Sequence, residues 1–336
     1  TLMFIAHKFK SSVRLVCSKL RHLNLSTMAT FGRSTSTGDM IAVAQMNSTN
    51  SKTENLATCK TLISKAVEQG AKMVFLPEAC DYIGNSNEET ESLAEPLNGP
   101  WLKSIQREAE SKKIWISLGG IHEKASNLES LAFQNAQVII NSQGEIAAVY
   151  RKVHLFNVNF PEKGVCYDVR FPEMSIKLTQ AGAQILTYPS AFMFETGANH
   201  WETLLKCRAL ENLAYVVAAA QTGAHGPKRK SWGHASIIDP YGSIIAQCSE
   251  GTNLAFAKIN LDYVETLRKS IPVWSNRRFD LYPKLEMSDE EVADLFQVVK
   301  RVEKVMEQKY KTDSSTLCIQ DGTHAGQTIR VCTNDN

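Results

Sequence analysis

Apolar residues recur along the chain in two spacings, which predict strands and helices in alternation. Short, nearly continuous apolar runs predict strands over residues 41–46, 73–76, 114–118, 137–141, 145–150, 185–188, 215–221, 235–239 and 243–247. Apolar residues at helical spacing predict helices over 53–69 and 101–112, from Pro172 onward, and over 198–213. Gly70 stands where a helix C-cap belongs.

Continuous apolar strands imply a sheet that is covered on both faces. The short turns "SQGE" and "PYG" join two pairs of these strands as hairpins, so the sheet is mixed. The pattern therefore predicts an α/β layered fold of the kind found in many enzymes.

Composition narrows the class of protein. The chain has 336 residues, 43% of them apolar and 21% charged, which suits a globular protein with one large core or two modest ones. The most continuous apolar run, "YVVAAA" at 215–220, has the length of a buried strand, so we expect no membrane insertion. "KRK" at 228–230 is a short solvated loop run, so we expect no nucleic-acid binding. The eight cysteines are scattered without a C-x-x-C pair, and we interpret them as reduced thiols with no metal site.

The first 38 residues differ from the rest in charge. They contain six Lys or Arg, several Ser and Thr, and no Asp or Glu, whereas the remainder has 31 basic and 35 acidic residues. An acid-free, hydroxyl-rich basic leader is typical of a mitochondrial targeting segment, and a disordered basic tail is the alternative. Met28, in "LSTMATFG", could start a shorter chain that lacks this leader. We therefore expect both cytoplasmic and mitochondrial localisation.

Three residues with catalytic side chains follow predicted strands or turns. Glu78 ends "VFLPEA", Lys152 ends "VYRK", and Cys166 stands on the Gly-flanked turn "GVCYD". Catalytic groups gather at strand ends in layered α/β folds. A thiol with a pKa of about 8.5 needs a base or cation nearby, and Glu78 can take its proton. Lys152 and the backbone N–H of Tyr167 can hold an oxyanion. The expected chemistry is acyl transfer from an amide through a thioester, followed by attack of water.

Each of these residues taken singly has a plainer interpretation: a loop acid, a surface charge and a small core residue. Together, "FLPEA", "YRKVHLF" and "VCYDVRFPE" resemble the three signature motifs of the nitrilase or carbon–nitrogen hydrolase superfamily. The catalytic set of that family is Glu, Lys and Cys, and the matching positions are Glu78, Lys152 and Cys166. The resemblance runs from about Met40 to Tyr282.

Five further sequence segments resemble one branch of that family, the deaminated glutathione amidases: "QILTYPSAF", "TGANHWE", "YVVAAAQTGAH", "SWGHASIIDPYG" and "NRRFDLY". The resemblance implies hydrolysis of deaminated glutathione to 2-oxoglutarate and cysteinylglycine. It also implies an α-β-β-α four-layer sandwich, no metal or organic cofactor, and a homo-oligomer that pairs two sheets. By the same resemblance Phe192, His200 and Trp201 face the substrate pocket, although a Trp at helical spacing with Leu204 and Leu205 is typical of a core.

The connection between the lysine and cysteine motifs departs from the family. Members normally have a few dozen residues there, including a loop with a further glutamate and a strand that delivers the cysteine. This chain passes from "NFPEKG" straight to "VCYD", so the resemblance implies an internal deletion at 164/165 and the loss of a central strand. Glu162 lies in the shortened stretch, and nothing assigns it the role of the lost acid. Our hypothesis is a shortened product with impaired folding or activity, because losing a buried strand leaves neighbouring backbone groups unpaired.

The C-terminal residues carry a second resemblance. Ser288 and Glu291 form a capping box for a predicted amphipathic helix. "DEEVADLFQ" and "LCIQDGTHAGQTIR" resemble an internal stretch of the fragile histidine triad family, which hydrolyses diadenosine triphosphate, and the order implies a fusion of the two families. Gln327 matches a polar residue that lies near the phosphates. Where that family has its His-x-His-x-His run, this chain reads "RVCTNDN", so we expect no phosphohydrolase activity.

These patterns divide the chain into a leader (1–38), a carbon–nitrogen hydrolase domain (39–284) and a truncated histidine triad-like segment (285–336). Three functions compete: a thiol amidase acting on a small carboxamide, a diadenosine triphosphatase inherited from a fusion parent, and a catalytically inactive interaction protein. The three signature motifs favour the first.

Overall fold

The computed structural model describes residues 38–124, 133–152, 168–226 and 229–278. The chain divides into two compact units, Thr1–Asn276 and Arg277–Asn336, and the described sheets and helices belong to the first. The expected boundary at 284/285 stays a prediction, and the predicted C-terminal helix lies outside the described residues.

An eight-stranded mixed sheet forms one layer of the first unit. Its order is β5-β4-β3-β2-β1-β8-β9, and β12 pairs with β1 off this path. The strands are β1 (Asp39–Met46), β2 (Met73–Phe75), β3 (Trp115–Lys124), β4 (Phe133–Ile140), β5 (Ile146–Arg151), β8 (Ala220–Ala224), β9 (Lys230–Trp232) and β12 (Asn253–Ile259). The pairs β1–β2, β2–β3 and β1–β8 are parallel, whereas β3–β4, β4–β5, β8–β9 and β1–β12 are antiparallel. The mixed sheet predicted from the hairpins is thus confirmed.

A smaller sheet has the order β11-β10-β7-β6. It consists of β6 (Ile185–Thr187), β7 (Tyr215–Ala218), β10 (Ser236–Ile238) and β11 (Ile244–Gln247). The predicted strand at 215–221 is therefore wrong as a single strand. β7 belongs to the smaller sheet and β8 to the larger one, and the chain crosses between them at Ala219. The run is buried throughout, so hydrophobicity alone gave no sign of the crossing.

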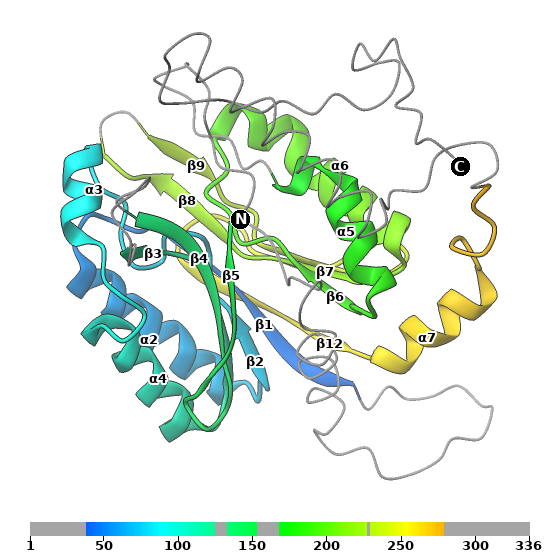
Figure 1. The fold of residues 1–336 in the computed structure, drawn as a ribbon, viewed down its shortest axis with the longest axis horizontal. Helices are drawn as coiled ribbons and strands as arrows, with labels where there is room; N and C mark the ends of the chain where they lie inside the picture. Colours follow the sequence, from blue (N-terminus) through cyan, green and yellow to red (C-terminus); the bar gives the residue numbers. More distant parts are fainter. Residues whose placement is uncertain (1–37, 125–132, 153–167, 227–228, 279–336) are drawn as a thin grey trace, which may run out of the picture. The chain divides into compact units, whose positions relative to one another are not determined.

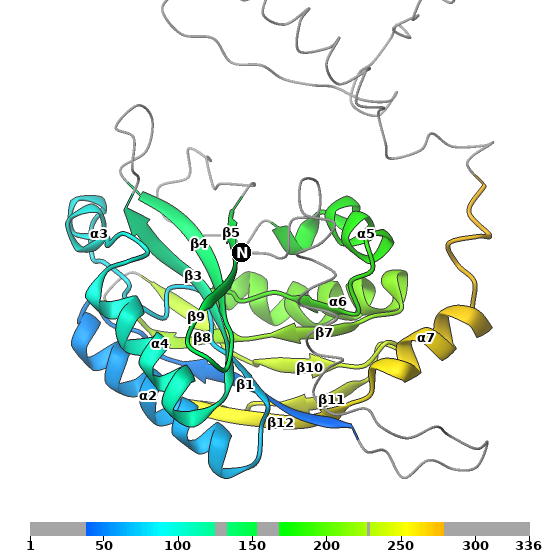
Figure 2. The same cartoon turned by 60° about the horizontal axis from the view of Figure 1, so that its bottom comes forward.

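Helices cover the outer face of each sheet. The described helices are α2 (Lys52–Glu68), α3 (Asn87–Leu93), α4 (Pro100–Lys112), α5 (Pro172–Gln180), α6 (Phe194–Asn212) and α7 (Leu261–Ser270), with a 3₁₀ turn at Asp168–Arg170. Figures 1 and 2 show α2 and α4 on one side of the paired sheets and α5 and α6 on the other. The α-β-β-α four-layer sandwich is therefore confirmed. None of the described helices is both long and apolar enough to span a bilayer.

Local sequence explains where several elements begin and end. The Ser51 hydroxyl accepts a hydrogen bond from the Glu54 N–H and so caps α2, and Gly70 adopts φ 77° just beyond its end. Pro100 occupies the first turn of α4, where its missing N–H costs no helical hydrogen bond. The helices α3 and α7 and the strands β9 and β12 are present although the sequence patterns did not predict them. Lys230, from the predicted loop run, begins β9 and stays exposed.

Strand β1 shows how two cores share one sheet. Ile41 and Val43 belong to a buried cluster that also includes Val217 of the smaller sheet and Trp201 of α6. Ala42, Ala44 and Met46 point to the opposite face and pack against the helix residues Leu62, Ile63 and Ile105. Because alternate side chains leave a strand on opposite faces, a continuous apolar run is needed where both faces are covered.

Candidate active site

Glu78 stands on a tight turn that directly follows β2. The Ala79 N–H donates to the Gly120 carbonyl oxygen at 2.7 Å, and Ala79 itself has φ 55°, a conformation that few non-glycine residues adopt. A Cβ on Gly119 would come 2.3 Å from the Pro77 carbonyl carbon, so only glycine lets β3 approach this turn so closely. Glu78 is 8% exposed. The turn therefore holds a carboxylate at the end of a buried parallel strand.

The Lys152 side chain contacts the Glu78 carboxylate. It follows β5 directly, and its N–H donates to the Asn135 carbonyl oxygen at 2.9 Å, which extends the β4–β5 pairing by one residue. Its Nζ lies 3.1 Å from Glu78 Oε1, and both side chains are about nine-tenths buried. The structure thus brings together two of the three predicted catalytic residues, 74 positions apart in the chain.

Two further groups donate to the Glu78 carboxylate. Asn135 Nδ2 lies 2.8 Å from Oε1, and the Ala191 backbone N–H lies 3.0 Å from Oε2. Ala191 belongs to the sequence "YPSAF" just after β6, so the smaller sheet contributes to the site as well. Hydrogen bonds of this kind favour the ionised form of a carboxylate. The Glu78 carboxylate therefore faces the Lys152 side chain and accepts hydrogen bonds on both of its oxygens.

A network of buried polar side chains holds the backbone of the turn that carries Glu78. Gln221 Nε2 donates to the carbonyl oxygen of Glu78 at 2.9 Å and to Ser48 Oγ at 2.7 Å, while its Oε1 accepts from the Ser48 N–H at 2.9 Å. His225 bonds through Nδ1 to the Ser48 carbonyl oxygen and through Nε2 to Ser231 Oγ. Burial lowers the pKa of His225 to about 4, so its imidazole is neutral near pH 7.

Cys166 and Tyr167 lie outside the described residues. The chain resumes at Asp168, and Arg208 of α6 donates from Nε to the Val169 carbonyl oxygen at 2.9 Å. The predicted reduced state of the cysteines is confirmed for the described ones, Cys59, Cys80, Cys207 and Cys248, which are free thiols.

The described thiols are poor candidates for the nucleophile. Cys80 stands two residues after Glu78, but burial, with a contribution from the neighbouring Cys59, raises the pKa of its thiol well above the ordinary value. Burial also raises the pKa of Cys248 to about 12. Within the described part of the chain, no group of three or more His, Cys, Asp or Glu side chains is arranged to hold a metal ion.

The three residues assigned to the substrate pocket differ in their surroundings. Phe192, next to Ala191, is 1% exposed and packs against Trp201, with 5.1 Å between ring centroids. Trp201 is equally buried and donates from Nε1 to the His234 carbonyl oxygen at 3.0 Å. His200 is exposed, and its Nδ1 lies 3.3 Å from Arg170 Nη2. Their assignment to the substrate pocket stays a prediction.

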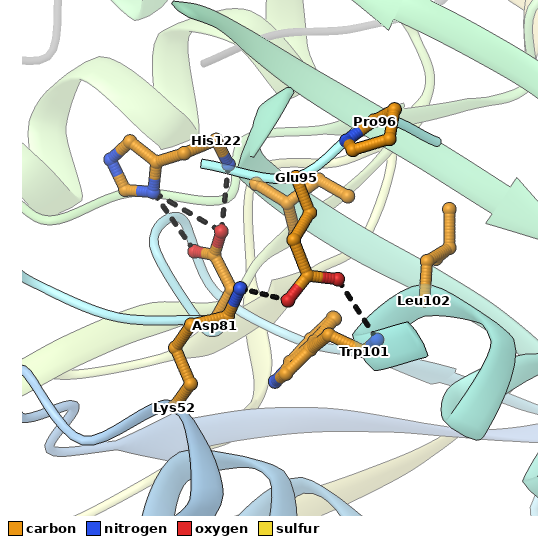
Figure 3. A pocket seen from close by; sticks show the side chains of 8 residues that line it. Lys52, Asp81, Glu95, Pro96, Trp101, Leu102 and His122 are labelled. Atoms are coloured by element: carbon orange, nitrogen blue, oxygen red, sulfur yellow. Dashed lines mark hydrogen bonds and ion pairs between the residues drawn. The ribbon is translucent and has the colours of Figure 1, made fainter. Parts of the chain in front are cut away.

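A second cluster fixes the chain beyond Glu78 (Figure 3). The Asp81 carboxylate accepts from the His122 backbone N–H at 2.8 Å and lies 3.1 Å from its Nδ1, which ties the turn to β3. The adjoining pocket is lined also by Lys52, Glu95 and Trp101, and Lys52 forms an ion pair with Glu95. This pocket lies beside the turn that carries Glu78 and is lined by neither Glu78 nor Lys152.

Sequence patterns missed Asn135 and Gln221. The predicted strand began at residue 137, whereas β4 begins at Phe133, so Asn135 fell outside it. Gln221 was included only as the end of an apolar run. Each is a polar residue within or beside a buried strand, and this is the feature that could have identified them, because buried polar groups need specific partners.

Comparison with known proteins agrees with this geometry. Residues 40–269 match the carbon-nitrogen hydrolase family, and residues 274–330 match the HIT domain. The chain therefore belongs to the carbon–nitrogen hydrolase family. The α-β-β-α sandwich and the buried Glu78–Lys152 pair agree with what the resemblance to that family implied. The chain is therefore a hydrolase of carbon–nitrogen bonds, and a HIT-domain segment follows the hydrolase domain in the sequence.

Particular relatives resemble the chain over most of its length. The nitrilase and fragile histidine triad fusion protein NitFhit of Caenorhabditis elegans is 37% identical over 390 aligned positions, covering 91% of this chain and 88% of that protein. The deaminated glutathione amidase of Bos taurus is 44% identical over 275 positions, covering 73% and 84%. The crystal structure of the C. elegans NitFhit protein superposes with a TM-score of 0.71 over 88% of this chain and 92% of that one.

Proposed function

We propose that this chain is a thiol amidase that hydrolyses deaminated glutathione to 2-oxoglutarate and cysteinylglycine. The observation that carries the proposal is the buried Glu78–Lys152 pair, with 3.1 Å between Nζ and Oε1 at the ends of two strands of one sheet. The substrate is proposed from the similarity to the Bos taurus amidase. A small carboxamide suits a site where a buried carboxylate lies beside a lysine ammonium group.

In this mechanism Glu78 takes the proton of the Cys166 thiol, and the sulfur attacks the amide carbon. The ammonium of Lys152 and the Tyr167 N–H stabilise the negative oxygen, and removing one such donor typically costs about 3 to 4 kcal/mol of transition-state stabilisation. The C–N bond breaks, the amine leaves with the proton that Glu78 held, and a thioester remains. Water, activated by Glu78, then releases the acid and restores the thiol.

Replacing the proposed nucleophile tests this function. Cys166→Ala is expected to abolish release of cysteinylglycine, measured by chromatography at saturating deaminated glutathione. Cys207→Ala, which removes a half-buried thiol in α6, serves as the matched control and keeps the parent rate. Equal rates in parent and Cys166→Ala would refute the amidase. No release by the parent chain would instead favour the inactive interaction protein.

We also propose that the chain is a shortened form of this fold. The bovine alignment spans 275 positions, but 73% of this chain is about 245 residues, so about 30 positions face a gap in this chain. Within the described residues no strand lies between β5 and β6 in sequence, and three-residue β6 ends the smaller sheet. Sequencing the transcript across Gly164 and Val165, and assaying a chain with a relative's segment inserted there, tests the proposal. A restored chain no faster and no more stable than the parent would contradict impairment.

We propose further that the protein forms homo-oligomers through its α6 face. Leu210 of α6 is 48% exposed, and its side chain lies over Gly242, next to Tyr241, which is 54% exposed. Exposed apolar residues that lie together are typical of protein interfaces. Leu210→Glu is expected to lower the molar mass measured by light scattering to that of one chain, with Ile146→Glu on β5 as the control. An unchanged mass would exclude this face.

Dual cytoplasmic and mitochondrial localisation is proposed on the acid-free composition of residues 1–38. A fluorescent fusion of the whole chain is expected to label mitochondria in part, whereas a fusion that starts at Met28 stays in the cytosol. Identical distributions would refute the targeting role.

A further inference from the structure

We propose that Asn135 is a positioning residue that holds Glu78 and Lys152 in their relative positions. The inference deepens the amidase proposal and rests on it. Asn135 contacts both groups through separate bonds. Its side-chain Nδ2 donates to Glu78 Oε1 at 2.8 Å, and its main-chain oxygen accepts from the Lys152 N–H at 2.9 Å. One residue of β4 thus fixes the base through its side chain and the lysine through its backbone.

The orientation of the Asn135 amide follows from its neighbours. A carboxylate oxygen only accepts hydrogen bonds, so Nδ2 must face Glu78, and Oδ1 then faces β3. There the chain has Gly120, at a register shift between β3 and β4, and a Cβ at that position would lie 1.7 Å from Asn135 Oδ1. The absence of a side chain at Gly120 therefore creates the space that the amide occupies.

This geometry has a chemical consequence. Asn135 and Lys152 approach the same oxygen of Glu78, at 2.8 Å and 3.1 Å. Without the amide, that oxygen keeps Lys152 as its described donor, and a carboxylate held by fewer hydrogen bonds is oriented less precisely towards the thiol that it must deprotonate. The ionised carboxylate also loses a hydrogen bond that favours it, so the base becomes active only at higher pH.

Three variants separate positioning from packing. Asn135→Ala removes the amide but keeps the backbone bond to Lys152. Asn135→Asp keeps the size and replaces the donor with a second carboxylate. Gly120→Ala leaves Asn135 in place and displaces its side chain. The matched control is Asn141→Ala, at the end of the same strand, where the amide bonds to Glu145 within the hairpin turn.

The readouts are kcat/KM for deaminated glutathione and the rate of Cys166 alkylation by iodoacetamide, each against pH in the full chain. We expect Asn135→Ala and Gly120→Ala to lower both rates about tenfold or more at neutral pH. In both variants the acid limb of each pH–rate profile moves upward by about one pH unit. In Asn135→Asp it moves further, because a second carboxylate beside Glu78 disfavours ionisation. Asn141→Ala keeps the parent profile even where its unfolding midpoint falls. Alkylation reports on the base whether or not the chain turns over.

Two results would overturn this inference in distinguishable ways. If Cys166→Ala abolishes hydrolysis while the Asn135 and Gly120 variants keep the parent pH profile, the amidase stands and the positioning role is wrong. If Cys166→Ala hydrolyses substrate at the parent rate, the amidase proposal itself fails, together with the role that depends on it. Profiles of Gly120→Ala and Asn135→Ala that move in opposite directions would also refute a shared mechanism.

Discussion

Gln221 holds the main chain of Glu78, with 2.9 Å between its Nε2 and the Glu78 carbonyl oxygen, although 143 positions separate the two residues. Gln221 lies in β8, which pairs with the end of β1 at Gln45 and Met46, and Glu78 follows β2, which pairs with β1 at residues 41–43. The bond therefore joins two segments that both adjoin β1 and fixes the backbone from which the candidate carboxylate projects.

Replacing Gln221 with Leu is expected to affect both stability and catalysis. It leaves the Ser48 N–H and the Glu78 carbonyl without the partner they have in the folded chain, and each unsatisfied buried group costs about 1–3 kcal/mol. We expect the free energy of unfolding in urea to fall by about 3 kcal/mol and kcat to fall at least about tenfold as the turn loosens.

A second buried glutamine provides the control for that experiment. Gln137 bridges the two sheets by donating to Ser117 Oγ and Thr187 Oγ1, away from the Glu78 turn. Gln137→Leu is expected to lower stability by a similar amount while kcat stays within about twofold of the parent. An equal loss of kcat in both variants would show that general loosening, and not the bond to Glu78, is responsible.

His225 makes stability depend on pH. Burial lowers its pKa to about 4 in the folded chain, against about 6.5 when unfolded, so between these values the unfolded chain binds more protons. Stability is therefore fully present above about pH 6.5 and falls as the pH drops towards 4, by about 3 kcal/mol in total. Urea unfolding at several pH values measures this, and His225→Asn should remove most of the slope in that window. An unchanged slope would exclude His225 as its source.

Thiol labelling should distinguish Cys166 from the described cysteines. Cys59, Cys80 and Cys248 are buried, and burial raises the pKa of Cys80 and of Cys248, so little thiolate forms at neutral pH. With iodoacetamide at pH 7.5, peptide mapping should show Cys166 labelled first, Cys207 next, and the three buried thiols only after addition of urea. Labelling of Cys80 ahead of Cys166 in the folded chain would contradict the assignment of the nucleophile.

Trp201 either packs in the core or contacts the substrate, and a substitution distinguishes these two roles. Trp201→Phe keeps an aromatic ring beside Phe192 but removes the donor to the His234 carbonyl oxygen. We expect the free energy of unfolding to fall by about 1 kcal/mol, because the His234 carbonyl oxygen loses one hydrogen bond but keeps the one from Ser236 Oγ. An unchanged KM would show a packing role, and a raised KM with unchanged stability would show contact with substrate. His200→Ala, at an exposed position, should leave stability within about 0.5 kcal/mol of the parent.

The chemistry of the site could be proposed from sequence because the motif residues are distinctive. "FLPEA" and "YRK" each place a charged residue just after a predicted strand, and the structure confirms that Glu78 and Lys152 meet. The supporting residues were not found in this way. Asn135 and Gln221 acquire their roles from partners 57 and 143 positions away, and no local pattern encodes such bonds.

The sequence by itself determined which segments are strands and helices over much of the chain, because burial on one or both faces sets the spacing of apolar residues. It determined the family and the identity of the candidate base and cation as well. Only the tertiary structure decided that residues 215–221 pass from one sheet to the other at Ala219, and that Asn135 joins the base to the lysine. Hydrophobicity records whether a side chain is covered but not which sheet covers it, and hydrogen bonds between distant strands exist only after those strands have paired.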